Sequence, residues 1–249
     1  MEEGPGVKAL EGLTLNLSKN EMSLTTIPDK NLENQSYQTI AEERDYYQAQ
    51  KKFWSFFAPF YDLAVAPASK LREQVVDFVN APHGAKILDV ATGTGKQAFA
   101  FARQGYDVTG IDLSEAMLGI ANRKNKYKNL KLQIADATHI PFETRAFDVS
   151  CVSFALHEMP LSVRERVLQE LVRVTKSEGT IVIVDFALPK NKIRRFFIYN
   201  FVKLFEGEHY VKYIKNDLNL SIQKANIAIT REIPILWGGA RIIKGRVMP

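Results

Sequence analysis

The sequence has only one cysteine, Cys151, in 249 residues, which excludes an internal disulfide framework. Chains without disulfides are typical of a reducing compartment, so we expect a cytoplasmic protein. Cys151 lies inside an apolar run, and we therefore expect a small buried side chain rather than a nucleophile.

Other features are missing as well. The four histidines are scattered without the spacing of metal ligands, so no metal site is predicted. No apolar stretch is long enough to span a bilayer, and the first residues lack the basic start and apolar core of a signal peptide. The net charge of +5 is small and there is no aromatic-basic RNA motif, so nucleic acid is not an expected partner.

The composition that remains is that of a globular protein, with 46% hydrophobic and 24% charged residues. The length favours one α/β domain with additions over two independent domains. Residues 1–40 are polar and weakly periodic, and we interpret them as a flexible N-terminal arm or irregular lid. The domain itself is expected over residues 41–249.

The chain is organised around residues 86–96, which read KILDVATGTGK. The apolar run from Ile87 to Val90 predicts a buried parallel strand. Gly93 and Gly95 permit a tight turn and a close approach of the backbone to a ligand. The helix predicted next points its free N–H groups toward that turn, so the segment is typical of a nucleotide-type ligand site.

Two cofactors fit this turn. Gly93, Gly95 and Ala98 satisfy the dinucleotide pattern G-x-G-x-x-G/A, in which the helix N-terminus holds a pyrophosphate. Asp89 at the strand end would repel a pyrophosphate but attract the ammonium group of S-adenosylmethionine. The residues favour S-adenosylmethionine, and a nicotinamide-dependent oxidoreductase is the alternative.

Four more strands are predicted at residues 106–112, 130–136, 147–154 and 180–187, with helical segments between them. Strands at 227–233 and 240–244 are expected to close the sheet as an antiparallel hairpin. The fold class is therefore α/β, with a doubly wound, mostly parallel, seven-stranded sheet. Its strand ends gather Asp89, Asp112, Asp136 and Ser153, where ligands bind in such sheets.

Two helix starts are predicted from their capping residues. Ser114 is expected to cap the helix after the second strand. Ser162 and Glu165 are expected to form a capping box for a helix that runs to about Thr175.

These residues together resemble the class I S-adenosylmethionine-dependent methyltransferases, and in particular the ubiquinone/menaquinone-biosynthesis C-methyltransferases and the phosphatidylethanolamine N-methyltransferases. The resemblance spans Phe53 to the C-terminus and implies a Rossmann-like methyltransferase fold. It is carried by residues 58–62, 88–95, 110–117, 136–142, 147–154 and 173–179.

The resemblance also implies roles for individual residues. The methionine portion of the cofactor would be held at the glycine turn, the ribose by the second strand's acid, and the adenine beyond it. The residues implied, in that order, are Asp89, Ala91, Gly93, Thr94 and Gly95, then Asp112, then Leu113, Met117, Asp136 and Ala137, with Ser153 beneath the cofactor. Ala91 stands where the family pattern has its first glycine.

The sequence departs from the quinone methyltransferases after the fourth strand. That family carries Gly-Ile/Leu-Arg-Asn there, whereas this chain has Ala155-Leu-His-Glu158. His157 is the candidate general base, because of its position and the near-neutral pKa of a histidine. The alternative is that His157 only lines the pocket.

Aromatic residues suggest the acceptor. They are dense at residues 53–60, where Pro59 should interrupt or bend a helix, and at 196–205 within an expected helical lid insertion at 190–220. We expect Phe57, Tyr61 and Phe197 to contact a small lipophilic acceptor such as a quinone precursor or a phospholipid amine. Cations near these aromatics suggest peripheral membrane contact; they are Arg194, Arg195 and Lys203. The alternatives are a lid with its own aromatic core and a non-catalytic S-adenosylmethionine-binding protein.

Overall fold

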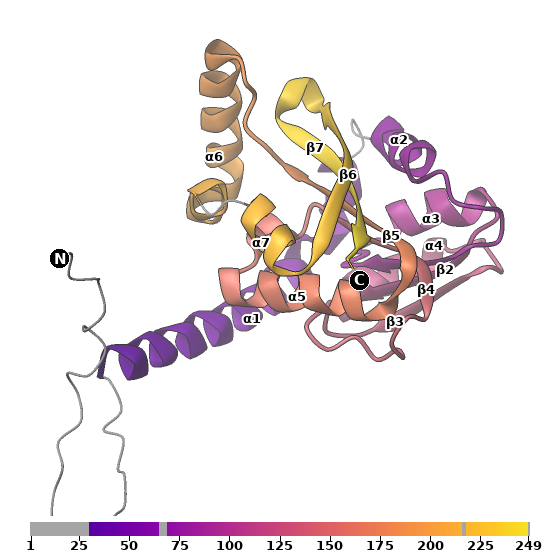
Figure 1. The fold of residues 1–249 in the computed structure, drawn as a ribbon, viewed down its shortest axis with the longest axis horizontal. Helices are drawn as coiled ribbons and strands as arrows, with labels where there is room; N and C mark the ends of the chain where they lie inside the picture. The colour runs from indigo at the N-terminus through magenta and orange to yellow at the C-terminus, as the bar shows by residue number, and fades with distance from the viewer. Residues whose placement is uncertain (1–29, 65–68, 216–217, 249) are drawn as a thin grey trace, which may run out of the picture. The chain divides into compact units, whose positions relative to one another are not determined.

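The computed structural model describes residues 30–64, 69–215 and 218–248, and it contains one seven-stranded sheet (Figure 1). The strands are β1 (Lys86–Val90), β2 (Asp107–Asp112), β3 (Leu130–Ile134), β4 (Phe147–Ser153), β5 (Thr175–Phe186), β6 (Ile227–Ile235) and β7 (Ala240–Val247). Their order in the sheet is β3-β2-β1-β4-β5-β7-β6.

The first five strands pair in parallel, and β7 is antiparallel to both β5 and β6. This confirms the predicted doubly wound sheet with an antiparallel C-terminal hairpin. The fifth strand begins earlier than predicted, because Thr175 pairs with Phe147 ahead of the main register, in which Val149 pairs with Thr180. The carboxyl ends of β1 to β4 consequently meet at one edge of the sheet.

The helices are α1 (Lys30–Ala64), α2 (Ser69–Val79), α3 (Lys96–Arg103), α4 (Glu115–Lys124), α5 (Leu161–Val174), α6 (Lys192–Lys215) and α7 (Leu218–Lys224). Two short 3-10 helices, η2 (Leu156–Glu158) and η3 (Leu236–Gly238), follow β4 and β6. Helices α2 and α3 pack on one face of the sheet and α5 and α7 on the other. Central strands are buried on both faces, so Ile87 enters the first core and Leu88 the second.

The chain divides into two compact units between Ala41 and Glu42. Of the predicted N-terminal arm, residues 1–29 lie outside the described residues, and from Lys30 onward the chain is helical as the start of α1. All contacts used for the site lie in the second unit. Within the described parts of the chain, no helix combines the length and apolar character needed to cross a membrane.

Of the three local predictions about helices, the cap at Ser114 is confirmed, whereas the capping box at Ser162 and an interruption at Pro59 are not found. Ser114 caps α4 as predicted and accepts a hydrogen bond from the Met117 N–H at 3.3 Å. The capping box at Ser162 is wrong, because Pro160 takes the N-cap position and α5 begins one residue before Ser162. The Ser162 hydroxyl instead donates to Glu43 Oε1 at 2.6 Å and ties α1 to α5. Pro59 lies inside α1 and does not interrupt it.

Candidate active site

A cavity of about 590 Å³ lies at the carboxyl ends of β1 to β4. Its floor is made by the loops that leave these strands, and its roof by one face of α1. The floor residues include Ala91, Gly93, Asp112, Leu113, Met117, Asp136, Ala137, Ser153 and His157, and the α1 residues are Tyr46, Tyr47, Gln50, Phe53, Trp54, Phe57 and Tyr61.

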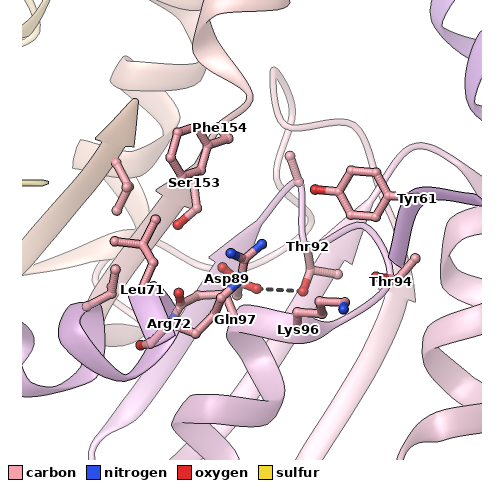
Figure 2. Close-up of a pocket in the computed structure, with 13 residues that line it drawn as sticks. Tyr61, Leu71, Arg72, Asp89, Thr92, Thr94, Lys96, Gln97, Ser153 and Phe154 are labelled. Atoms are coloured by element: carbon pink, nitrogen blue, oxygen red, sulfur yellow. Dashed lines mark hydrogen bonds between the residues drawn. The ribbon is translucent and has the colours of Figure 1, made fainter. Parts of the chain in front are cut away.

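A smaller cavity of about 30 Å³ adjoins the large one and is lined by Asp89; Figure 2 shows its lining residues. The two share Tyr61, Ala91 and Ser153 in their linings. Arg72 of α2 also lines both, and its positive charge acts to lower the pKa of Asp89. Figure 2 shows Arg72 and Asp89 converging at the same end of the small cavity. A carboxylate beside a guanidinium complements a ligand that carries both an ammonium and a carboxylate group.

Asp89 is almost fully buried at the end of β1. Its Oδ2 accepts a hydrogen bond from the Thr92 hydroxyl at 2.5 Å. Burial raises the pKa of Asp89 to about 7, against the lowering effect of Thr92, and the negative charge of Asp112 adds to the rise. A cationic ligand group at this position would compensate the buried charge.

Asp112 ends β2 beside the glycine turn and is held there by backbone donors. Its Oδ2 accepts from the Gly93 N–H at 2.7 Å, and its Oδ1 accepts from the Ser114 N–H at 2.8 Å. Burial raises the pKa of Asp112, although these two hydrogen bonds oppose the rise. The carboxylate is therefore fixed in orientation at the cavity wall, as capture of a vicinal diol requires.

Asp136 follows β3 and is oriented by three donors. Its Oδ1 accepts from the Thr138 N–H and hydroxyl, both at 2.8 Å, and from the Tyr47 hydroxyl at 3.3 Å. Since Tyr47 belongs to α1, this contact joins the roof of the cavity to its floor.

The turn after β1 has left-handed backbone at Ala91 (φ 55°), Gly93 (φ 56°) and Gly95 (φ 82°). Ala91 occupies a conformation that favours glycine, so the substitution of the family's first glycine carries a conformational cost here. Gly95 is the N-cap of α3, and a Cβ there would lie 2.8 Å from the Phe99 ring. Gly95 lines neither cavity, so it shapes the turn without facing the ligand space.

Thr94 fixes the end of α1 over this turn. The buried Thr94 hydroxyl donates to Asp62 Oδ1 at 2.6 Å, and Lys124 forms an ion pair with the same carboxylate. Burial acts to raise the pKa of Asp62, but the hydrogen bonds from Lys124 and Thr94 and the charge of Lys96 bring it below its usual range. The anionic Asp62 thereby links α1, the glycine turn and α4.

The loop after β4 carries the candidate base. Phe154 has a φ of 51°, which is unusual for a bulky residue. Its side chain lines both cavities. His157 lines the large cavity, and its Nδ1 lies 2.7 Å from Oδ1 of Asp185 at the end of β5. Glu158 Oε1 lies 3.8 Å from the His157 Nε2, and Gln50 of α1 donates to Glu158 Oε2 at 2.8 Å.

Thirteen of the fifteen predicted site residues line one or both cavities; Gly95 and Phe197 do not. Phe197 lies on α6 with two thirds of its surface exposed. Tyr61 is part of the roof, and burial raises its pKa to about 12. Among the described residues, no three His, Cys, Asp or Glu side chains are grouped to hold a metal ion.

Sequence reasoning missed several lining residues. Tyr46, Tyr47, Gln50 and Arg72 carried no motif, because they reach the site only through the packing of α1 and α2. Asp185 did carry a signal: it is a single carboxylate at the end of a β-branched strand, and a buried charge there requires partners.

Residues 87–179 match a protein family described as a methyltransferase domain. The demethylmenaquinone methyltransferase of Renibacterium salmoninarum is 35% identical over 137 residues, which cover 53% of this chain and 56% of that protein. The demethylmenaquinone methyltransferase of Thermotoga maritima is 36% identical over 149 residues, covering 59% and 58%. The chain thus spans little more than half the length of these curated relatives.

The fold is shared with solved structures of methyltransferases. A S-adenosylmethionine-dependent methyltransferase from Aquifex aeolicus superposes with a TM-score of 0.53 at 20% identity, over 71% of this chain and 89% of that one. Asp89, Asp112 and Asp136, at or just beyond the ends of β1, β2 and β3, line these cavities. Over residues 87–179 the chain therefore matches a methyltransferase domain, it is similar to the demethylmenaquinone methyltransferases, and it has the fold of a solved S-adenosylmethionine-dependent methyltransferase.

Proposed function

We propose that the protein transfers a methyl group from S-adenosylmethionine to a small lipophilic acceptor. One observation carries the proposal: a single cavity joins an acidic cradle to an aromatic chamber, with His157 in its lining. The cradle suits the polar cofactor and the chamber suits an apolar molecule. The cavity volume is within the range of small-molecule sites.

The residues present fit the cofactor at each end. Asp89 and Arg72 would hold the ammonium and carboxylate of its methionine part. Asp112 would accept from the ribose hydroxyls, and Asp136 from the adenine amine. The packing of Leu113, Met117 and Ala137 in the same lining supplies the apolar sides of an adenine pocket. When bound, the cofactor supplies a methyl group on a positively charged sulfur, which the attacking atom of the acceptor displaces in line.

The chain's own contribution to the reaction is positioning and removal of a proton. A carboxylate can only accept, so His157 donates its Nδ1 proton to Asp185 and keeps its basic lone pair on Nε2. His157 would take the proton of the acceptor as the new bond forms, and the imidazolium produced is stabilised by Asp185. The roof of α1 excludes water from the transfer.

The acceptor is proposed to be a reduced quinone precursor. The roof presents flat aromatic side chains, Phe53, Trp54 and Phe57, suited to a ring system. The relatives named above carry the name demethylmenaquinone methyltransferase. His157 and Glu158 replace the arginine and asparagine of that family, so proton removal here falls to the His157–Asp185 pair. A phospholipid amine is the second acceptor class for the same cavity.

Such an acceptor resides in lipid, so we also propose contact with a membrane surface. Large apolar side chains are exposed on α1 and α6, including Phe56 (77%) and Phe196 (65%). Arg194, Arg195 and Lys203 supply positive charge on α6, the helix that carries Phe196. The helical segment 190–220 would then act as a lid at this surface.

The test is an incubation of the protein with methyl-labelled S-adenosylmethionine and either reduced demethylmenaquinone or a total lipid extract. Label in the organic phase supports the proposal, and mass analysis names the methylated atom. Label only in water-soluble products would refute the lipophilic acceptor. Cofactor binding without transfer to any acceptor would favour a non-catalytic binding protein, and competition by NAD would favour the oxidoreductase alternative.

A further inference from the structure

The turn between β6 and β7 has an unusual backbone. Leu236 (φ 48°), Trp237 (φ 55°) and Gly238 (φ 89°) are three consecutive residues in the left-handed region. Only the glycine adopts this region without cost, so the leucine and the tryptophan are held in strained conformations. Strain of this kind persists where the surrounding structure enforces it, and it concentrates at functional sites.

The strained turn separates two neighbouring side chains. Leu236 lines the large cavity, whereas Trp237 is 83% exposed, more than any other large apolar residue described. Among the described residues, seven non-glycine residues have positive φ, and Ala91, Phe154 and Leu236 all line the cavity. The turn thus joins the cavity wall directly to an exposed indole.

The turn rests on the segment that leads into α6. A Cβ on Gly238 would contact Pro189 at 3.5 Å, and one on Gly239 would lie 2.9 Å from Ile198. The Ala187 N–H also donates to the Gly239 carbonyl at 3.0 Å. Figure 1 shows α6 and the turn of the β6–β7 hairpin at the same end of the sheet. The position of Trp237 is therefore fixed relative to the start of α6.

The start of α6 is apolar and cationic at once. Ile193, Phe196 and Phe197 are each at least 65% exposed. Residues 186–205 contain five lysines and arginines and no aspartate or glutamate; the cations are Lys190, Lys192, Arg194, Arg195 and Lys203. Exposed single apolar residues are common, but a group of them among cations marks an interaction surface.

We propose that the Leu236–Trp237 turn and the start of α6 (residues 190–197) dock the protein on an anionic lipid bilayer. We call these residues the docking surface. Trp237 sits at the level of the headgroups, where an indole meets both apolar and polar surroundings, and the cations face anionic lipids. A lipophilic acceptor then passes from the bilayer past Leu236 into the cavity. The docking stands on its own, and only the passage of an acceptor rests on the proposed function.

The test uses the full chain and vesicles of phosphatidylglycerol and phosphatidylcholine, with pure phosphatidylcholine for comparison. The chain has two tryptophans, so Trp54→Phe leaves Trp237 as the sole reporter. We expect a blue shift of its emission on anionic vesicles, quenching by brominated acyl chains, and reversal by salt. Unchanged emission on anionic vesicles would overturn the proposal, as would a shift with poly(U) RNA but not with vesicles.

Substitutions test which residues form the docking surface. Trp237→Ser and the double change K192Q/R194Q should each weaken binding to anionic vesicles at least tenfold, and the double change should also flatten the salt dependence. Ile134→Ser is the matched control, since Ile134 is 54% exposed on the edge strand β3, and it should bind as the unmodified protein does. Equal binding by all these variants would overturn the assignment of the docking surface.

A further comparison keeps docking distinct from catalysis. Trp237 does not line the cavity, so Trp237→Ser should methylate a short-chain acceptor in detergent-free solution as the unmodified protein does. The same variant should lose at least tenfold in rate with an acceptor embedded in vesicles. Vesicle binding without any methyl transfer would refute the proposed function and leave the docking surface intact.

Discussion

Nδ1 of His157 lies 2.7 Å from Oδ1 of Asp185, and both side chains are almost completely buried. Asp185 is itself held by the N–H groups of Phe186 at 2.8 Å and of His157 at 3.2 Å. The ring of Phe186 lies edge-on to the imidazole with centroids 4.6 Å apart. The imidazole is thus fixed in place by a carboxylate that is anchored to the backbone.

Replacing either His157 or Asp185 should lower kcat and leave the binding of S-adenosylmethionine nearly unchanged. We expect His157→Asn to lower kcat by about 10²- to 10⁴-fold, the range of general-base contributions. Asp185→Asn should lower kcat by about ten- to a hundredfold, because an amide does not stabilise the imidazolium. The KM for S-adenosylmethionine should stay within twofold, which a general loss of structure would not allow.

Asp148→Asn is the control for these variants. Asp148 forms an exposed ion pair with Lys176 at the opposite end of β4, so its replacement should leave kcat unchanged. Full activity of Asp185→Asn, measured as initial rates of labelled methyl transfer, would exclude the positioning role of Asp185.

Arg72 provides a prediction about cofactor binding. Arg72→Gln should raise the Kd of S-adenosylhomocysteine by about ten- to a hundredfold, as expected for loss of a charged hydrogen bond. It should leave the Kd of 5′-methylthioadenosine unchanged, because that ligand lacks the amino acid part. Arg103→Gln, an exposed ion-pair residue on α3, is the matched control for calorimetric titration. An equal loss for both ligands would place Arg72 elsewhere in the site.

Asp89 should make cofactor binding depend on pH. Because burial raises the pKa of Asp89 to about 7, the carboxylate becomes protonated as the pH falls below 7 and loses its attraction for an ammonium group. Between pH 7 and pH 5.5, where the ligand's ammonium stays charged, we expect affinity for S-adenosylhomocysteine to fall about five- to tenfold per unit.

The decisive comparison is the same titration with Asp89→Asn. This variant should bind weakly at every pH, with most of the slope removed. Burial also raises the pKa of Asp112, which lines the same site. A slope in Asp89→Asn equal to that of the unmodified protein would show that Asp89 does not meet the ammonium group.

The floor of the site could be predicted from sequence because its determinants are local. Asp89 and Asp112 each end an apolar strand, and the pattern of strands alone brings their ends to one edge of the sheet. The roof could not be predicted in the same way. Tyr47 contacts Asp136 from 89 positions away in the chain, and the register of that contact depends on how the whole of α1 packs.

Two further differences have local physical causes. Ser162 matched a capping pattern, but Pro160 has a fixed φ and starts the helix first. Phe197 was expected at the acceptor because of the aromatic residues around it in the sequence. A cluster of aromatic residues on a helix does not show which face of that helix packs against the rest of the protein. The exposure of Phe197 suits the docking surface better than the cavity.

Ala91 gives a prediction for stability. Its φ of 55° costs a non-glycine residue about 1–2 kcal/mol, of which part is regained because alanine restricts the unfolded chain. Ala91→Gly should therefore raise the free energy of unfolding by about 0.5–1 kcal/mol. Ala116→Gly, within the regular helix α4, should lower it by about 0.5–1 kcal/mol. Urea denaturation of both variants measures the difference, and a change of the same sign in both would contradict the left-handed backbone at Ala91.

The residues that line the cavity come from two parts of the chain, one inside and one outside the segment that matches the methyltransferase domain family. The loops of the floor lie within residues 87–179, which match the methyltransferase domain family, whereas α1, Arg72, Phe186 and Leu236 lie outside that segment. Substitutions on one face of α1 can therefore reshape the proposed acceptor chamber while every acid of the floor is retained. The choice of acceptor and the binding of the cofactor would then depend on different segments of the chain, so that one could be altered by substitution without the other.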